Sequence, residues 1–367
     1  MVIAKVIRVV IVDDSPVARD ILRALLEEQE GIEVIAEACN GKEAVDIVAQ
    51  LRPDLVTIDL NMPVMSGIEA IVHIMQSKAV PILVVSNESD AELAYQAISS
   101  GALEVIAKPT YTLQGAENFV RQVRLLAGIP VITRLRPRTT PELPAPVLKA
   151  YKSLSSPVPM TVPVSAVRQV FAIASSTGGP QALAHVLPQL PADFPAPIVI
   201  AQHISDGFID GMAQWLSGVC QLNVKVAQDG EPLRNGCVYL SPSEQHMTVT
   251  VERCIKLKAR AVGDIYRPSC DVLLTSVAEA FGTQAVGLIM TGMGRDGPQG
   301  MRAIHDKGGV TWAQDEDSSV IYGMNAEAVN LGVIQRQLPL NTIASEMLRI
   351  AGATPMAERF NAVRRDA

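Results

Sequence analysis

The sequence contains few cysteines, and none of them form a Cys-x-x-Cys pair. There are five cysteines among 367 residues, which is an odd number. A disulfide framework is therefore not expected, and neither is a zinc site. We interpret the thiols as small apolar side chains in a reducing compartment.

A long apolar run and an excess of positive charge are also missing. No run approaches the roughly 20 residues needed to span a bilayer. The run Ile7–Val12 is followed by Asp13-Asp14 rather than by a small-residue cleavage site, which argues against a secretory signal. The formal net charge of −7 disfavours bulk binding to nucleic acid or to an anionic membrane. We expect a cytoplasmic protein with no membrane insertion and no nucleic-acid partner.

The composition that is present suffices for two hydrophobic cores. Hydrophobic residues make up 48% of the chain and charged residues 19%, and the length favours two domains. Residues 5–128 alternate apolar runs with amphipathic stretches, so they predict a doubly wound parallel sheet of the flavodoxin-like kind. The expected strands are Ile7–Val12, Glu33–Ala38, Leu55–Ile58, Ile82–Val85 and Leu103–Ala107, and the expected helices are Pro16–Glu28, Lys42–Leu51, Ile68–Gln76, Ala91–Ser99 and Glu117–Ala127.

A proline-rich, basic segment follows this first domain. Eight prolines lie between positions 130 and 163, together with five basic residues and a single acidic one. Proline removes backbone donors and interrupts helix and sheet periodicity. Residues 129–165 are therefore expected to be a semi-extended linker, with room for a helical stretch near Pro146–Ser153.

In residues 166–352, apolar runs again alternate with helical stretches. This pattern predicts a second α/β domain, with a Rossmann-like three-layer fold around another doubly wound parallel sheet. Residues 353–367 are expected to be a flexible tail. The expected strands are Val170–Ala174, Ile198–Ala201, Val224–Val226, Cys237–Leu240, Met247–Val251, Val286–Met290 and Val310–Ala313, and the expected helices are Pro180–Leu187, Ile209–Val219, Val272–Phe281, Gly297–Lys307 and Ile343–Ala351.

Carboxylates follow the strands of the first domain. Asp13 and Asp14 follow the first strand, Asp59 follows the third, Ser86 ends the fourth and Lys108 ends the fifth. Because the carboxyl ends of parallel strands meet at one sheet edge, these groups should lie together. An all-oxygen cluster of carboxylates suits Mg²⁺, and a carboxylate can attack a phosphoryl group. The alternative is that Asp13-Asp14 only starts a helix.

Three motifs of this domain resemble the response-regulator receiver family over nearly all of residues 7–127. They are Val-Asp-Asp-Ser at 12–15, Asp-Leu-Asn-Met-Pro-Val-Met-Ser-Gly at 59–67 and Ala-Lys-Pro at 107–109. The resemblance implies that Asp59 accepts phosphate from a histidine kinase. It further implies a Mg²⁺ ion held by the carboxylates of Asp13, Asp14 and Asp59 and by the backbone carbonyl of Asn61. Ser86 would be the switch hydroxyl, and Lys108 would contact the phosphate.

A serine-containing turn opens the second domain. The segment Ala-Ser-Ser-Thr-Gly-Gly-Pro at 174–180 lies between an expected strand and helix. A serine on such a turn can act as a nucleophile, with backbone N–H groups such as that of Thr177 nearby for an oxyanion. A phosphate-cradling loop is the alternative, but the Walker spacing is absent, as is the Gly-x-Ser-x-Gly elbow.

A nucleophilic serine needs a base and an orienting acid. The chain has five histidines, and His203 ends the next strand at the same sheet edge. Asp296 lies in the glycine-rich turn 290–297, where the backbone N–H of Met293 can line an oxyanion hole. The alternatives are a structural His203 and an Asp296 that only caps the following helix. The other histidines are expected to be structural or exposed: His73, His185, His246 and His305.

These motifs resemble the catalytic domain of bacterial chemotaxis protein-glutamate methylesterases over about residues 170–350. The resemblance extends to segments 229–233, 238–242, 267–271 and 322–324. It implies that Ser176 is the nucleophile, His203 the base and Asp296 the orienting acid, with no cofactor for the ester chemistry. Ala174-Ser175 stands where the family usually has Gly-Ala, so Ser175 is a rival hydroxyl, although the register favours Ser176.

The resemblance implies demethylation of glutamate γ-methyl esters, and deamidation of glutamines, on the cytoplasmic helices of chemoreceptors during sensory adaptation. It also implies that the unphosphorylated receiver packs over the esterase cleft. Two alternatives stay open: an esterase of the same fold acting outside chemotaxis, and a binding module with a degenerate triad. A nucleic-acid regulator is disfavoured, since the C-terminal half offers no helix-turn-helix candidate.

Overall fold

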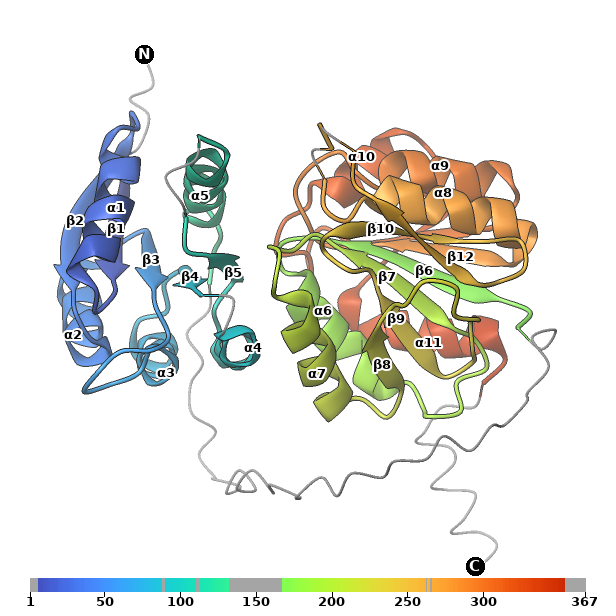
Figure 1. Cartoon of the computed structure of the whole chain (residues 1–367), viewed down its shortest axis with the longest axis horizontal. Helices are drawn as coiled ribbons and strands as arrows, with labels where there is room; N and C mark the ends of the chain where they lie inside the picture. The colour runs from blue at the N-terminus through green and yellow to red at the C-terminus, as the bar shows by residue number, and fades with distance from the viewer. Residues whose placement is uncertain are drawn as a thin grey trace, which may run out of the picture.

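The computed structural model describes residues 6–87, 90–109, 113–131, 167–261, 263–264 and 266–353. They form two α/β domains, which stand side by side in Figure 1. Most of the expected linker, its helical stretch near 146–153 and nearly all of the expected tail lie outside the described residues. Among the described helices, none combines the length and apolar character needed to cross a membrane.

The first domain is a five-stranded parallel sheet in the order β2-β1-β3-β4-β5. Successive residues of a strand face opposite sides, so Val9 and Ile11 pack towards α1 and α5, whereas Val10 and Val12 pack towards α2 and α3. The strands are β1 (Ile7–Val12), β2 (Ile32–Ala38), β3 (Leu55–Ile58), β4 (Ile82–Ser86) and β5 (Glu104–Ala107). The helices are α1 (Pro16–Glu27), α2 (Gly41–Leu51), α3 (Gly67–Ser77), α4 (Ala91–Ser100) and α5 (Leu113–Leu126).

The second domain is built on a seven-stranded parallel sheet in the order β14-β13-β12-β6-β7-β9-β8. One face carries α6, α7 and α11, and the other carries α8, α9 and α10. The strands are β6 (Val170–Ser175), β7 (Ile198–Gln202), β8 (Asn223–Val226), β9 (Cys237–Leu240), β12 (Ala285–Ile289), β13 (Val310–Gln314) and β14 (Arg336–Leu338). The helices are α6 (Gly179–Val186), α7 (Ile209–Val219), α8 (Cys270–Phe281), α9 (Pro298–Asp306), α10 (Met324–Asn330) and α11 (Leu340–Ala351), with short 3₁₀ turns η3 (Leu187–Gln189) and η4 (Gly282–Gln284).

The strand order reverses beside β6, because the chain first builds outward through β7 and later returns to add β12 on the other side. In a doubly wound sheet, a reversal of this kind opens a crevice at the carboxyl ends of the strands. The expected fold class of both domains is confirmed. The loops that follow β6, β7 and β12 carry Ser176, His203 and Asp296, so the topology brings all three to one edge.

One expected strand belongs to a separate element. The segment predicted as Met247–Val251 is β10 (Gln245–Val249), which pairs antiparallel with β11 (Ile255–Ala259) outside the main sheet. The second strand of this hairpin was missed, as were β14 and α10. In β11, Ile255 is buried while the lysines at 256 and 258 are not, an alternation typical of a half-buried strand.

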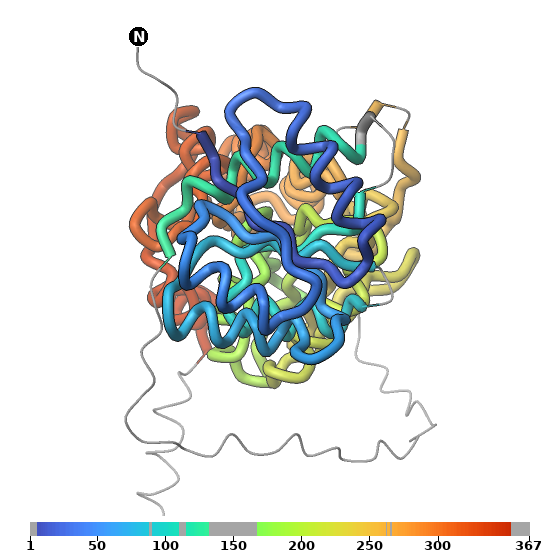
Figure 2. The backbone as a smooth tube through the Cα atoms, turned by 90° about the vertical axis from the view of Figure 1, so that its left-hand side faces the viewer, coloured from blue at the N-terminus to red at the C-terminus, as the bar shows by residue number. Residues whose placement is uncertain are grey.

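The two domains contact each other through the receiver-like α4 and the helices α6 and α7. Tyr95 stacks on Trp215, with ring centroids 5.4 Å apart. The side chain of Gln181 donates a hydrogen bond of 2.6 Å to the carbonyl of Ala102. Figure 2, which looks from the side of the first domain, shows that domain in front of the second.

Candidate active site

The strand-end side chains of the first domain do form one cluster. Carboxylate oxygens of Asp13, Asp14 and Asp59 lie within 4.8 Å of one another. The ammonium of Lys108 lies 2.7 Å from Asp13 Oδ2 and 3.1 Å from Asp59 Oδ2. Ser86 Oγ lies 3.3 Å from Asp59 Oδ1. The predicted convergence of these residues is therefore observed.

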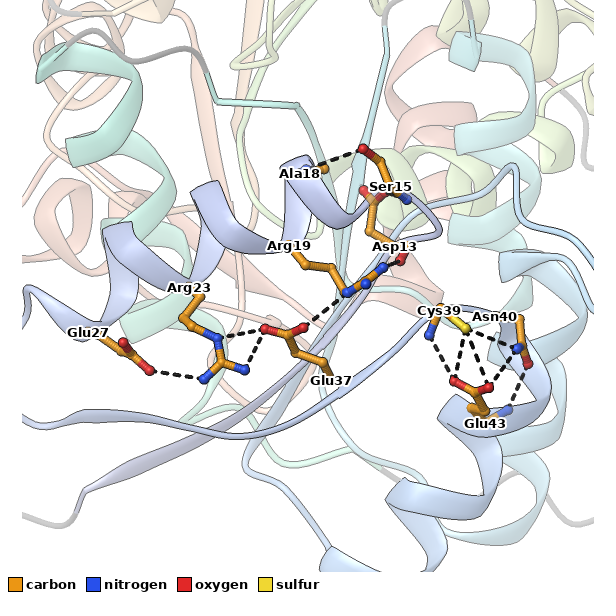
Figure 3. A network of polar contacts seen from close by, with 10 residues as sticks. All are labelled: Asp13, Ser15, Ala18, Arg19, Arg23, Glu27, Glu37, Cys39, Asn40 and Glu43. Carbon is orange, nitrogen blue, oxygen red and sulfur yellow. Dashed lines mark hydrogen bonds and ion pairs between the residues drawn. The ribbon is translucent and has the colours of Figure 1, made fainter.

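The loop that carries Asp13 is held by a polar network (Figure 3). Asp13 Oδ1 accepts a hydrogen bond from the backbone N–H of Ser15, and Arg19 donates to the Asp13 carbonyl. Arg19 is in turn paired with Glu37 of the neighbouring strand β2, at 3.0 Å. Ser15 is also the N-cap of α1, so the residues that start the helix and those that build the site overlap.

Burial and charge act in opposite directions in this cluster. Desolvation raises the pKa of Asp59 above its ordinary value, although the positive charge of Lys108 offsets part of the effect. Desolvation alone would lower the pKa of Lys108, but its hydrogen bonds and charge interactions with Asp13 and Asp59 more than compensate, so the pKa is raised. The cluster thus keeps a cation next to the expected phosphoacceptor.

The donor set of this cluster fits a hard divalent cation. Three carboxylates at one edge supply only oxygen ligands, which suits Mg²⁺ rather than a softer ion. The side chain of Asn61 donates to Asp90 at 2.7 Å, and the expected role of its backbone carbonyl stays a prediction. Sequence reasoning missed Asp90, which also accepts from Ser86 Oγ at 3.0 Å.

In the second domain, Ser176 lies on the turn between β6 and α6. Ser176 is buried when both domains are present, and its backbone N–H donates to the Thr291 carbonyl at 3.0 Å. Gly178 has φ 79°, a left-handed conformation that favours glycine. A side chain at Gly292 would lie 2.5 Å from Ser176 Cβ, so this glycine allows the β12 loop to approach the serine.

The rival hydroxyl of Ser175 is engaged elsewhere. Ser175 is fully buried, and its Oγ donates to Gln202 Oε1 at 2.7 Å. The amide of Gln202 donates to the carbonyls of Ser176 and His203, both at 2.8 Å. Gln202 therefore ties the serine loop to the histidine loop. Nothing in the sequence alone distinguished it from any other polar residue at a strand end.

The pair of His203 and Asp296 is formed, with Nε2 and Oδ2 2.8 Å apart. Asp296 does not cap the helix that follows it. Its carboxylate accepts the backbone N–H groups of Cys270 and Asp271 and the hydroxyl of Ser269, at the start of α8. Burial would raise the pKa of Asp296, but the hydrogen bond and charge of His203, with these backbone donors, hold the pKa below its ordinary value.

The start of α9 is in turn capped by a carboxylate of α8. Asp271 Oδ1 accepts the backbone N–H groups of Gly297 and Gly300, at 2.9 and 2.7 Å. The first turn of α8 is thus capped by a carboxylate from the loop before α9, and the first turn of α9 is capped by a carboxylate from the first turn of α8. Ser269 and Asp271 entered the sequence analysis only within segment 267–271 and were given no role of their own. A local signal was present, because a serine before an apolar helical run, followed by an acid in the first turn, is the usual start of a helix.

The other contact of the expected Ser–His–Asp chain, between Ser176 and His203, is not a hydrogen bond among the residues that the structure describes. His203 follows β7, which pairs with β6 in register Ser175↔Gln202, and the backbone N–H of His203 donates to the Ser175 carbonyl at 2.9 Å. Since Nε2 faces Asp296, Nδ1 is the ring nitrogen left for the serine. Tyr266, which sequence reasoning also missed, stacks on the imidazole with centroids 5.2 Å apart.

The two expected oxyanion donors lie on the loops beside Ser176. Thr177 is buried and its carbonyl accepts a hydrogen bond from the Thr291 hydroxyl at 2.9 Å, whereas Met293 is exposed. Within the described residues, no hydrogen bond uses the backbone N–H of Thr177 or of Met293. Their assignment as oxyanion donors stays a prediction.

One of the other histidines is buried rather than exposed. His246 on β10 accepts the backbone N–H of Ser269 through Nδ1 at 3.0 Å, and its Nε2 lies 2.8 Å from Asp264. The expectation of a structural role matches this arrangement, because the pair holds the loop that carries Ser269.

A serine, a histidine and a carboxylate at the ends of adjacent parallel strands, together with a first domain that carries an expected phosphoacceptor, are typical of a receiver-controlled serine hydrolase. Comparison with known families agrees. Residues 171–347 match the CheB methylesterase family, and residues 9–116 match the response regulator receiver domain.

The most similar relatives include two curated proteins. Protein-glutamate methylesterase/protein-glutamine glutaminase 3 of Paramagnetospirillum magneticum is 52% identical over 350 residues, which cover 95% of this chain and 97% of the relative. Protein-glutamate methylesterase/protein-glutamine glutaminase 2 of Anaeromyxobacter dehalogenans is 41% identical over 340 residues, which cover 92% of this chain and 95% of the relative. The chain belongs to the family of receiver-containing CheB methylesterases.

A solved structure, the CheB methylesterase catalytic domain of Thermotoga maritima, matches with 33% identity and a TM-score of 0.48. The match covers 50% of this chain and 98% of that domain.

Proposed function

We propose that this protein is a phosphorylation-regulated protein-glutamate methylesterase and protein-glutamine glutaminase. Its substrates would be γ-glutamyl methyl esters and glutamines on the cytoplasmic helices of chemoreceptors, and a chemotaxis-type histidine kinase would be its phosphodonor. The observation that carries the proposal is the 2.8 Å contact of His203 with Asp296 at the sheet edge that also carries Ser176.

The geometry supports the following chemistry. Asp296 accepts a hydrogen bond from the Nε2–H of His203, which keeps the proton of the neutral imidazole on Nε2. Nδ1 is then unprotonated and able to take the hydroxyl proton of Ser176 as the oxygen attacks the ester carbonyl. Backbone N–H groups of Thr177 and Met293 would stabilise the oxyanion. Methanol leaves with the proton held on Nδ1. Water, activated by the same nitrogen, then releases the glutamate and regenerates the serine.

The contacts between the domains support steric control of this site. The receiver residue Glu104 interacts with the side chain of Thr177, next to the serine. A cavity of about 810 Å³ lies between α1, α5 and Met293, so the receiver also adjoins the second expected oxyanion donor. Val320, which contacts the Gly178 turn, packs against the apolar cluster under α1 and α5. A receptor helix can reach Ser176 only if this face of the receiver moves away.

Asp59 is the proposed trigger of that movement. Mg²⁺ held by Asp13, Asp14 and Asp59 would neutralise charge on the transferred phosphoryl group. The phosphoryl oxygens would draw Lys108 and Ser86 towards them. Because Lys108 directly follows β5, and Glu104 opens the same short strand, a shift at the acceptor reaches the Thr177 contact through four residues.

Methanol release from methylated receptor membranes tests the ester chemistry. Ser176→Ala should lower the rate by at least about 10³-fold, since the nucleophile is lost. Ser175→Ala is the matched control and should stay within a few-fold of the unaltered protein, because its hydroxyl is hydrogen-bonded to Gln202. Equal rates for Ser176→Ala and the unaltered protein would reject the assignment. Binding to the membranes without methanol release would favour the binding-module alternative.

A further inference from the structure

The thiol of Cys270 takes no part in the proposed mechanism, yet it lies against the imidazole of His203. Cys270 is the first residue of α8 and is fully buried. Its Sγ lies 3.5 Å from His203 Nε2 and 3.4 Å from the carbonyl oxygen of Ala201. Burial, with the nearby charges of Asp296 and Asp271, raises the pKa of this thiol. A reactive thiolate is therefore not the explanation for its position.

Three chemically different donors converge here. The imidazole of His203, the thiol of Cys270 and the carboxylate of Asp296 each present one ligand atom, and these atoms lie within 4.8 Å of one another. They come from the loops after β7 and β12 and from the start of α8. No Cys-x-x-Cys motif in the sequence indicates this group of three ligands, because only the fold brings His203, Cys270 and Asp296 together.

The spacing fits a tetrahedral zinc ion. Zinc bonds of about 2.0 Å to nitrogen and about 2.3 Å to sulfur, at tetrahedral angles, place these two ligand atoms about 3.5 Å apart. The distance between His203 Nε2 and Cys270 Sγ is 3.5 Å. The nitrogen–oxygen pair, now 2.8 Å apart, would have to open to about 3.4 Å when the proton between the two groups is replaced by the ion.

We propose that His203, Cys270 and Asp296 form a binding site for Zn²⁺, and that Zn²⁺ bound there inhibits the esterase. The ion would replace the proton shared by His203 and Asp296, and it would also displace the thiol proton, with both protons released to solvent. Two anionic ligands then balance the charge of the ion in a buried site. The inhibition, but not the binding, rests on the proposed function.

The receiver cluster offers a useful contrast within the same chain. Its three carboxylates provide only oxygen, which suits Mg²⁺, whereas the nitrogen–sulfur–oxygen set around Cys270 suits Zn²⁺ or Co²⁺. Mg²⁺ in excess should therefore fill the first site without competing at the second. This difference allows the second site to be measured alone.

Binding is tested by titrating the full-length protein with Co²⁺ in excess Mg²⁺ and recording the absorption spectrum. Thiolate coordination gives a charge-transfer band, so the unaltered protein should develop this band up to one equivalent, and Cys270→Ala should not. Cys39→Ala and Cys237→Ala are controls, since one of these thiols is exposed and the other is buried in β9. A band retained in Cys270→Ala, or absent from the unaltered protein, would overturn the proposal.

Inhibition is tested separately with Zn²⁺ in the methanol-release assay, each variant being compared with its own metal-free rate. The concentration of Zn²⁺ that halves the rate should rise at least about tenfold in Cys270→Ala and stay unchanged in Cys237→Ala. Circular dichroism and a second variant, Cys270→Val, separate loss of the ligand from loss of the fold. Equal Zn²⁺ sensitivity of all folded variants would contradict the proposal. If no variant releases methanol, the cobalt spectrum still decides the binding claim.

Discussion

At the scale of single residues, the carboxylate of Asp296 performs two tasks. One oxygen faces His203 and the N–H of Cys270, and the other accepts the hydroxyl of Ser269 and the N–H of Asp271. The backbone donors fix the carboxylate, and the carboxylate fixes the imidazole. A residue that caps a helix is thereby also the group that orients the proposed base.

Replacing Asp296 should separate these two tasks. We expect Asp296→Asn to lower the rate of methanol release by about 10⁴-fold, because an amide stabilises the wrong tautomer of His203. The loss of a charged cap should also destabilise the domain by about 1 kcal/mol. The matched control is Asp271→Asn, which weakens the cap of α9 without touching the imidazole. Thermal unfolding should respond similarly in both variants, and equal losses of rate would contradict the orienting role.

At the scale of elements, the β10–β11 hairpin connects the surface to the catalytic loops. His246 on β10 holds the N–H of Ser269 on one side and pairs with Asp264 on the other. Ser269 caps α8 through the N–H of Val272 and also donates to Asp296. A hairpin outside the main sheet thus helps to position the carboxylate at its edge.

Removing this histidine should weaken catalysis without abolishing it. We expect His246→Ala to lower kcat by about tenfold with little change in KM, since His246 is buried but its loss leaves the base less well oriented. His246→Gln, which keeps a hydrogen-bond acceptor, should restore part of the rate. Steady-state kinetics on receptor membranes measures both parameters. A change confined to KM, or no recovery with glutamine, would argue against a positioning role.

At the scale of the whole molecule, the receiver and the esterase meet through apolar packing of α4 against α6 and α7, to which polar and aromatic contacts are added. Gln181 donates to the Ala102 carbonyl, and Tyr95 stacks on Trp215. We expect Gln181→Ala to raise the rate without phosphodonor and to leave the phosphorylated rate nearly unchanged, because only the docked arrangement uses this bond. Equal effects on both rates would show that Gln181 acts within the esterase itself.

Phosphorylation should act through the same contacts. A small phosphodonor with Mg²⁺ should raise the rate of the unaltered protein, whereas Asp59→Asn should not respond, since it lacks the acceptor oxygen. Removal of Mg²⁺ with EDTA from zinc-free protein should abolish the stimulation while leaving the basal rate intact, because the proposed ester chemistry uses only side chains and backbone groups of the second domain. A phosphodonor effect that persists in Asp59→Asn would reject the proposed trigger.

Docking of the domains should also depend on pH through Glu104. Burial raises the pKa of this carboxyl from its ordinary value of 4.5 to about 7, although the N–H of Val105 and the nearby side chain of Thr177 act the other way. In the docked arrangement the buried Glu104 carboxyl holds its proton more tightly than it would when exposed, so the stability of the docked arrangement falls as pH rises between about 4.5 and 7. This difference in pKa corresponds to about 3 kcal/mol of docking free energy at most.

The fluorescence of Trp215, measured in a Trp312→Phe background, reports this docking because the indole stacks on Tyr95 at the interface. The midpoint of unfolding or undocking in denaturant should move to lower denaturant as pH rises through that window. Glu104→Gln has no proton to lose and should give a flatter profile. A profile unchanged by this substitution would contradict the assignment to Glu104.

The sequence by itself determined which residues stand at the ends of the strands. Apolar runs and helix caps are local signals, and they placed β1, β3 and β9 at their observed bounds and the other central strands within one residue. Parallel sheets gather the residues that follow their strands at one edge. The candidates Asp13, Asp59, Ser176, His203 and Asp296 followed from these two facts, together with the resemblance to known families.

Only the tertiary structure decided how these residues are held. The engagement of Ser175 by Gln202, the capping of α8 by Asp296, the hairpin contact of His246 and the thiol beside the imidazole all join segments far apart in the chain. Such contacts depend on the register between neighbouring strands and on how loops pack, neither of which leaves a local pattern. The same holds for the docking of the receiver, because Glu104 and Thr177 become neighbours only when the two folded surfaces meet.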